Sequence, residues 1–477
     1  MPALQTDYLV IGAGATGLAF ADTLLAHSDA HITFVDRRAL PGGHWNDAYP
    51  FVTLHQPSAF YGVNSLPLGS GRKDTLGPNA GLYEQATGAE VCSYFQQVMQ
   101  RRLLPSGRVH FLPLHECRGQ PGERAQAVSL LSGAVTEITV RRRVVDAAHF
   151  MPEVPATTPP AYHVAAGVRL LSPTQLAQIG HPAQAAEPPA GYCIVGAGKT
   201  AMDTGVWLLS QGVPPERIHW VVPRDSWLVN RLTTQPGAEF FMASMGGMLD
   251  QMRAFAAARD VQDLFLRLES TGQMLRIDPT QTPRMFHYAT LAEAEVRLLR
   301  QITQVIRRGR VQAIEPDALV MAQGRVAMPP GLVYVNCTAS AVRARRNEPI
   351  FQPGRIVPQL VRVPLVTFSA AVCAYVEANY PDDATRNALC RPAPFPSGVE
   401  GYIAATLVSQ MNQHAWNQDK ALRDWMRGTR LDGFGQLAAE VSRDDAEKMA
   451  VLGELRQTLA PAMANAQRLL AGLQAPA

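Results

Sequence analysis

The sequence predicts an α/β protein with two Rossmann-like dinucleotide-binding domains, and three observations support this prediction. A glycine-rich turn follows an apolar run in YLVIGAGATGLAF (8–20), and another follows an apolar run in YCIVGAGKTAMD (192–203). Each run has the length of a buried strand, and each turn leads into a helical pattern. The chain has 477 residues, enough for two or three domains, and its 47% hydrophobic content suits an ordinary globular core.

The first glycine-rich turn contains Gly12, Gly14 and Gly17 in the pattern G-x-G-x-x-G. In this pattern the three glycines permit a tight turn, the approach of a pyrophosphate, and close packing of helix against strand. The next strand, HITFVDRR (31–38), ends at Asp36, close to the spacing of about 20 residues expected for an acid that binds a ribose. Because an acid there repels a 2′-phosphate, we expect FAD or NAD at this turn.

The second glycine-rich turn repeats the pattern with Gly196 and Gly198, and Ala201 takes the third position, where any small residue suffices. The following helix would present its free N–H groups to a pyrophosphate. Lys199 either reaches that pyrophosphate or only caps the turn. A second dinucleotide is therefore expected here.

The strand after this turn lies in RIHWVVPRDSWLVNR (217–231) and favours NADP(H) over NAD(H). Its tip carries Arg224 in place of the ribose-binding acid, and Arg231 follows seven residues later. A guanidinium offers a planar fork to a phosphate. The neighbouring Asp225 weakens this inference, and the alternative is that both arginines are ordinary surface residues.

The stretch RRALPGGHWNDAYPFVTLHQPS (37–58) resembles the class B flavin-dependent monooxygenases, which include the flavin-containing, Baeyer–Villiger and N-hydroxylating enzymes. In that family a GG-x-W stretch beside the flavin likewise follows the acid. The resemblance implies that FAD occupies the first turn, with Asp36 at the ribose and Arg37 near the adenine. The residues implied to line the cofactor are Gly42, Gly43 and Trp45, although Trp45 is equally explained as a core aromatic.

The same resemblance extends to the second turn, where the family commonly has G-x-G-x-S-G/A-x-D. It implies that NADPH reduces the flavin, and that a flavin hydroperoxide then transfers one oxygen of O₂ to a nitrogen, sulfur or carbon centre of a small organic molecule. The protein is therefore expected to be an enzyme with FAD and NADPH as cofactors. The matching positions here are Gly196, Gly198, Thr200, Ala201 and Asp203.

Two departures from the family pattern affect the expected chemistry. The inter-domain fingerprint F-x-G-x-x-x-H is replaced by FMPEVPATTPPAYHVAAG (150–167), where Phe150 and His163 do not have that spacing. His55 and Gln56 stand where the family often has an asparagine near the flavin, and they are our candidate catalytic residues. The alternatives are an NADPH-dependent flavin reductase or oxidase without oxygen transfer, and a non-catalytic nucleotide-binding protein.

The expected organisation follows the alternation of strands and helices. A helix is expected near 88–103, and a pair of strands is expected near 125–147. The chain is expected to divide into a first part of the FAD domain (1–165), a connector (166–188), an NADP domain with a helical insertion (189–310), a second part of the FAD domain (311–400) and a helical C-terminal region (401–477).

Composition excludes several other classes. The net charge of +3, from 43 basic and 40 acidic residues, gives no nucleic-acid footprint. No CxxC or HExxH motif supports a redox pair or a metal site. Without a signal-like N-terminus or a long apolar run, a cytoplasmic protein without membrane segments is expected. The sequence does not identify the substrate. It also does not determine the oligomeric state, and a homo-oligomer is possible.

Overall fold

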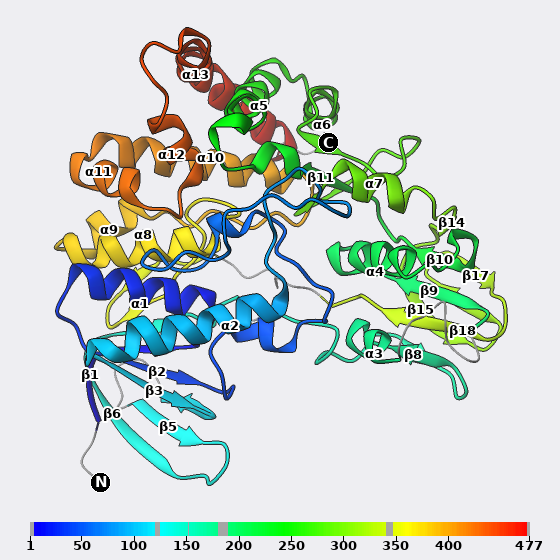
Figure 1. Cartoon of the computed structure of the whole chain (residues 1–477), viewed down its shortest axis with the longest axis horizontal. Coiled ribbons are helices and arrows are strands. Elements are labelled where there is room, and N and C mark those ends of the chain that lie inside the picture. Colours follow the sequence, from blue (N-terminus) through cyan, green and yellow to red (C-terminus); the bar gives the residue numbers. More distant parts are fainter. Residues whose placement is uncertain (1–3, 120–124, 151, 180–188, 340–346, 475–477) are drawn as a thin grey trace.

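The structure, a computed structural model, describes residues 4–119, 125–150, 152–179, 189–339 and 347–474. Two sheets with their helices lie side by side, and a helical region covers them on one side (Figure 1). Figure 1 also shows that the C-terminal helix α13 (Ala446–Gln474) lies beside α5 (Gly247–Ala257), far from the N-terminus. The predicted α/β class with two nucleotide-binding units is therefore confirmed.

The first sheet contains the first glycine turn, which we define as residues 12–17. Its main strands run in the order β19-β20-β6-β1-β2-β3, and β1 is parallel to both of its neighbours. Helix α1 (Ala15–His27) packs against α8 (Val366–Asn379), which is buried along most of its length. The strands of this sheet are β1 (Leu4–Ile11), β2 (Ile32–Asp36), β3 (Val109–Pro113), β4 (His115–Arg118), β5 (Ala125–Ser129), β6 (Val135–Asp146), β19 (Phe351–Gln352) and β20 (Arg355–Ile356).

The second sheet contains the second glycine turn, residues 196–201, and is parallel throughout, in the order β14-β10-β9-β18-β8. Strands β9 and β18 are completely buried, as expected for the centre of a parallel sheet. Helix α4 (Lys199–Ser210) follows the turn and contacts α7 (Glu293–Leu299). The strands are β8 (Arg169–Leu171), β9 (Gly191–Val195), β10 (Ile218–Val221), β14 (Gln304–Ile306) and β18 (Leu332–Asn336).

Two smaller sheets accompany the second unit. The first has the order β12-β11-β13 and the second the order β17-β16-β15-β7. Their strands are β11 (Ser226–Asn230), β12 (Met274–Leu275), β13 (Met285–Leu291), β7 (His163–Val164), β15 (Val311–Glu315), β16 (Ala318–Met321) and β17 (Gly324–Ala327).

The helical region joins the predicted insertion to the C-terminal tail. Helices α5, α10 and α13 contact one another, and their apolar faces share a core with α6. Helices at 88–103, in the insertion and after residue 400 agree with prediction. The helices not yet given are α2 (Gly88–Val98), α3 (Pro173–Gln178), α6 (Val261–Ser270), α9 (Asp383–Leu389), α10 (Val399–Gln418), α11 (Lys420–Gly428) and α12 (Gly433–Ala439), with short 3₁₀ or π turns at 43–47, 58–60, 99–103, 104–106, 215–217, 231–234, 238–240 and 242–246.

The predicted domain boundaries are wrong in two places. Residues 311–336 were expected to return to the first unit, but β18 pairs with β9, and β15 and β16 share a buried cluster with β9 and β10. These strands therefore belong to the second unit. Residues 166–178 are not a connector, because β8 extends the second sheet by pairing with β18. Short apolar strands carry no signal for the sheet that they join, because any parallel edge of suitable length accepts them.

None of the helices that the structure describes combines the length and the apolar character needed to cross a bilayer. Among the described residues, no group of three or more His, Cys, Asp or Glu side chains is arranged to hold a metal ion.

Candidate active site

The first glycine turn has the backbone that its sequence predicts. Gly12 follows β1 with φ of +99°, a conformation that side chains other than glycine rarely adopt. A Cβ added to Gly17 would lie 2.1 Å from the carbonyl oxygen of Gly12 and 3.2 Å from the Cβ of Ala147. Because the nearer atom belongs to the backbone, this position has no room for a side chain.

A loop closes over this turn from one side. The N–H of Gly42 donates to the carbonyl of Ala13 at 2.8 Å. A Cβ added to Gly43 would lie 3.0 Å from the Cα of Gly14, so two glycines face each other across a narrow gap. The GG pair noted in the sequence is therefore required by close backbone approach.

Asp36 lies at the end of β2 and is buried. Its carboxylate accepts from the N–H of Ala13 at 2.6 Å and from the N–H of Arg38 at 2.7 Å. The acid therefore fixes the turn to the neighbouring strand, and its role at a ribose stays a prediction. Arg37 points into solvent, 3.4 Å from Glu116.

Trp45 is half-buried, and its indole N–H donates to the hydroxyl of Tyr61 at 2.9 Å. Burial raises the pKa of Tyr61, so its hydroxyl stays protonated at neutral pH. Trp45 packs against the core of the first unit. Contact between Trp45 and a flavin stays a prediction.

The second glycine turn shares the sharp backbone turn of the first. Gly196 has φ of +129°, and a Cβ added to it would lie 2.7 Å from the carbonyl oxygen of Cys337. A Cβ added to Gly198 would meet no atom within 4 Å. The second turn is therefore open at the position where the first turn is covered.

Cys337 directly follows β18, so this strand ends beside the second glycine turn.

Lys199 begins α4 and forms a buried ion pair with Asp203, one helical turn later. The other carboxylate oxygen of Asp203 accepts from the hydroxyl of Tyr49 at 2.6 Å. Burial and the Asp203 carboxylate raise the pKa of Tyr49 well above its ordinary value. Thr200 lies in the first turn of α4 and also hydrogen-bonds to Tyr49. In this structure Asp203 thus links helix α4 to the first unit through Tyr49, and Lys199 is paired with that same acid.

Residues 42–56, which we call the joining loop, contact both glycine turns. Gly42 bonds to the first turn, and Tyr49 bonds to the helix of the second. At its end, His55 lies in the field of Lys199 and Arg231. Burial, with these two cations, lowers the pKa of His55 to about 3, so the imidazole is neutral at physiological pH.

Arg231 is buried, with 1% of its side chain exposed, and lies 2.7 Å from a carboxylate oxygen of Glu295. The predicted contact between Arg231 and a phosphate at the end of β10 does not fit this position, because the Arg231 guanidinium is buried and paired with Glu295. It joins the two units instead, donating to the carbonyl of His55 at 3.3 Å, to Oδ1 of Asn79 at 3.1 Å and to the carbonyl of Thr290 at 3.2 Å.

Gln56 is directed toward its own loop, where its amide lies 3.5 Å from the carbonyl of Phe60. The structure brings His55, Lys199 and Arg231 together, but it does not add Gln56 to that group. Arg430, which sequence analysis missed, holds the following segment from the C-terminal region. It donates to the carbonyls of Val63 at 2.8 Å, Ala59 at 2.7 Å and Tyr61 at 2.6 Å.

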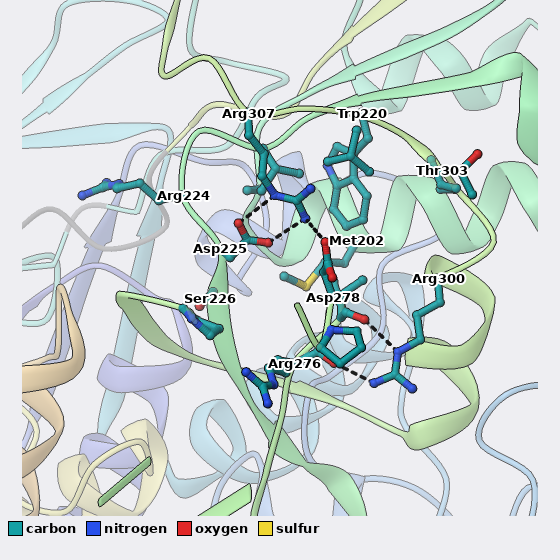
Figure 2. Close-up of a pocket in the computed structure, with 17 residues that line it drawn as sticks. Met202, Trp220, Arg224, Asp225, Ser226, Arg276, Asp278, Arg300, Thr303 and Arg307 are labelled. Carbon is teal, nitrogen blue, oxygen red and sulfur yellow. Dashed lines mark hydrogen bonds and ion pairs between the residues drawn. The ribbon is translucent and has the colours of Figure 1, made fainter. Parts of the chain in front are cut away.

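A cavity of about 390 Å³ adjoins the second glycine turn. Ala197, between the two glycines, lines it, together with Met202 on α4 and Trp220 on β10. Arg224 stands at its edge, exposed and directed away from Asp225, whose carboxylate is bound by Arg307 (Figure 2). The structure thus places Arg224 beside the cavity, although its contact with a phosphate stays a prediction.

The two units each have a glycine turn between a parallel strand and a helix, and one loop contacts both. Their fold is that of the class B flavin-dependent monooxygenases. Residues 10–64 match the family described as NAD(P)-binding Rossmann-like domain. The polycyclic ketone monooxygenase of Thermothelomyces thermophila superposes with a TM-score of 0.52 at 13% identity, covering 97% of this chain and 85% of that one. An open structure of cyclohexanone monooxygenase gives 0.51 at 13%, covering 96% and 98%. At such identities the likeness shows the fold alone.

Relatives with higher sequence identity show the family to which the chain belongs. Uncharacterized proteins of Mycobacterium tuberculosis and Mycobacterium bovis are 41% identical to this chain over 470 residues, which cover 98% of it and 85% of each relative. The chain belongs to the family of these mycobacterial proteins.

Proposed function

We propose that the protein is an FAD- and NADPH-dependent monooxygenase that oxygenates a nitrogen, sulfur or carbon centre of a small organic molecule. One observation supports this above the others: the joining loop contacts the first glycine turn through Gly42 and the helix of the second turn through Tyr49. Two dinucleotides held at these turns would therefore meet at one junction.

The residues present at both turns fit a dinucleotide. Gly14 and Gly198 are the N-cap residues of helices α1 and α4, and no described side chain caps either N-terminus. The first N–H groups of each helix are thus free to bind phosphate oxygens. In this proposal Asp36 serves the FAD ribose, and Arg224 approaches the 2′-phosphate of NADPH from the cavity edge.

FAD, when bound and reduced by NADPH, supplies the activation of O₂. The chain supplies position and polarity. His55 is neutral and donates its ring N–H to the backbone of Tyr288, so its other ring nitrogen can accept a hydrogen bond at the junction without bringing a charge there. Arg231 donates to the His55 carbonyl, and its own charge is balanced by Glu295. In this proposal, that hydrogen bond holds the end of the joining loop near the junction.

The proposal is tested on protein purified without added flavin. We expect a yellow protein that releases FAD on denaturation, oxidises NADPH in air, and incorporates label from ¹⁸O₂ into a product during a substrate screen. A colourless protein that takes up no FAD would contradict the proposal. FAD-bound protein that consumes NADPH and releases stoichiometric hydrogen peroxide with every candidate substrate would favour the alternative, an oxidase without oxygen transfer. The cytoplasmic location and the use of O₂ stay part of this proposal.

A further inference from the structure

The cavity beside the second glycine turn contains an acid that sequence analysis treated as an obstacle. Asp225 immediately follows Arg224, at the end of the strand where a Rossmann domain binds the adenosine ribose. An acid at that place accepts hydrogen bonds from ribose hydroxyls and repels a 2′-phosphate. Asp225 with a free carboxylate would therefore select NADH over NADPH.

The structure does not leave that carboxylate free. Arg307 follows β14, whose residue Ile306 pairs with Val221 of β10, so the ends of the two strands lie side by side. Its Nε donates to Oδ2 of Asp225 at 2.9 Å, and its Nη2 donates to Oδ1 at 3.0 Å. Both oxygens of Asp225 are thus engaged in a bidentate pair, the strong form of an arginine–carboxylate contact.

The same guanidinium also restrains a second acid. Nη2 of Arg307 lies 3.0 Å from Oδ2 of Asp278, which lines the cavity from the opposite loop. Figure 2 shows Arg307 between these two carboxylates, with Arg224 directed away from them. Four arginines line this cavity, and Arg307 is the one that binds both of these acids. Arg276 pairs with Glu269, and Arg300 donates to backbone carbonyls.

We propose that Arg307 is a specificity-determining positioning residue: by binding both oxygens of Asp225, it makes an acid-bearing ribose site accept a 2′-phosphate. This inference rests on the proposed function, because it takes the second turn to bind a nicotinamide dinucleotide. Arg224 and Arg307 then have separate roles. Arg224 offers charge to the phosphate from the rim, and Arg307 removes the repulsion from within.

The test measures ligand affinity, so it does not depend on turnover. Isothermal titration calorimetry on the full, flavin-loaded chain gives the dissociation constants of 2′,5′-ADP and 5′-AMP, which differ only in the 2′-phosphate. Wild-type protein should bind 2′,5′-ADP more tightly. Arg307→Gln should lower that preference on the order of tenfold, because Asp225 and Asp278 then lose the cation that binds them both and repel the phosphate.

Two further variants separate this role from a structural one. Arg307→Lys keeps the charge and should retain most of the preference. The double variant Asp225→Asn/Arg307→Gln removes both the cation and the nearer of the two repelling carboxylates. It should therefore restore most of the preference for 2′,5′-ADP that Arg307→Gln loses. A purely structural role for Arg307 predicts no such rescue.

Arg325→Gln is the matched control. Arg325, on β17, also bridges two carboxylates, those of Glu315 and Asp317, but it is outside the cavity lining. It should leave the affinity ratio unchanged. The proposal is overturned if wild-type protein prefers 5′-AMP, if folded Arg307→Gln keeps the wild-type ratio, or if Arg325→Gln shifts the ratio equally. Wild-type protein that binds neither nucleotide and oxidises no NADPH would remove the proposed function itself, and this inference with it.

Discussion

The two glycine turns have similar backbones and different surroundings. Both begin with a positive-φ glycine and end in a helix without a side-chain cap. At the second glycine of the motif they diverge, because Gly14 lies against Gly43 whereas Gly198 has no neighbour within 4 Å of an added Cβ. The motif specifies the backbone conformation of the turn, and the surrounding residues determine whether a ligand can approach that backbone from solvent.

This difference matches the two cofactors in the proposal. A flavin remains with its enzyme through many turnovers, and a turn covered by a loop suits a ligand that stays. A nicotinamide dinucleotide enters and leaves in every cycle, and an open turn beside a cavity of about 390 Å³ suits that exchange. The predictions below test whether covered and open turns respond differently to the same kind of change.

The largest effect is expected at the covered turn. In Gly17→Ala the new Cβ would lie 2.1 Å from the backbone carbonyl oxygen of Gly12, so the turn must shift. We expect a protein that is purified without flavin and is destabilised by about 3 kcal/mol, the upper end of ordinary overpacking effects. Absorbance at the flavin band and urea unfolding measure the two effects.

Gly205→Ala is the control for this change. Gly205 also lies in a helix after a glycine turn, but its added Cβ would meet only side-chain ends, 2.8 Å from Cδ2 of Leu299 and 3.3 Å from Cδ1 of Ile302. It should keep its flavin. Equal flavin content in both variants would remove the first turn from the proposed FAD site.

The next effect concerns the connection between the turns. Asp203→Ala leaves the buried Lys199 ammonium without its counter-ion and removes the acceptor of the Tyr49 hydroxyl. Breaking a buried pair by removing one partner costs about 3 kcal/mol, and urea unfolding should show a loss of that size.

A pair with the same spacing provides the comparison. Lys420 and Asp424 also lie four residues apart on a helix, but their side chains are 82% and 44% exposed. Asp424→Ala should leave the urea unfolding curve almost unchanged, because solvent screens such a pair. If the two variants lose stability equally, the Lys199–Asp203 contact is not the buried link described above.

Sequence reasoning predicted the local backbone well, and the reason is physical. Positions such as Gly12 and Gly17 are specified by sterics within a few residues, so the motif and its consequence are visible together. The spacing of Lys199 and Asp203 was also visible as neighbours on one helical face, although Tyr49, which completes that group, comes from a distant segment.

Long-range partners account for what was mispredicted or missed. Arg231 was expected at a phosphate because nothing local reveals that Glu295 and Asn79 converge on it. Strand β18 was given to the wrong sheet because its apolar sequence fits any buried parallel position. Arg307 and Arg430 went unnoticed, since an arginine between apolar segments does not show which carboxylate or carbonyls it will meet.

A smaller effect is expected on the joining loop. The folded state holds the pKa of His55 at about 3, below its ordinary value of 6.5. Between these values the unfolded chain binds a proton that the native protein does not, so stability is complete above pH 6.5 and falls as the pH is lowered. At pH 5 the loss is about 2 kcal/mol.

The His55→Gln variant should lose correspondingly less stability than wild type between pH 7 and pH 5, as measured by urea unfolding at both values. His44 adds a loss of the same sign in both proteins, because burial lowers its pKa to about 4. His110→Gln, at an exposed position on β3, should follow wild type. Parallel pH profiles for wild type and His55→Gln would show that His55 is not held neutral at the junction.

The smallest effect is expected at the open turn, and it would separate the two turns most clearly. An added Cβ at Gly198 meets no protein atom, so Gly198→Ala should fold normally, keep its flavin and unfold within about 0.5 kcal/mol of wild type. The methyl group would instead occupy the space where a pyrophosphate approaches the backbone. We therefore expect the KM for NADPH to rise roughly tenfold, equivalent to about 1.4 kcal/mol of lost binding, with kcat at saturating NADPH largely retained. Steady-state kinetics measure both constants. A variant that loses flavin while its KM for NADPH is unchanged would reverse the assignment of the two turns, because the open turn would then be the one that holds FAD.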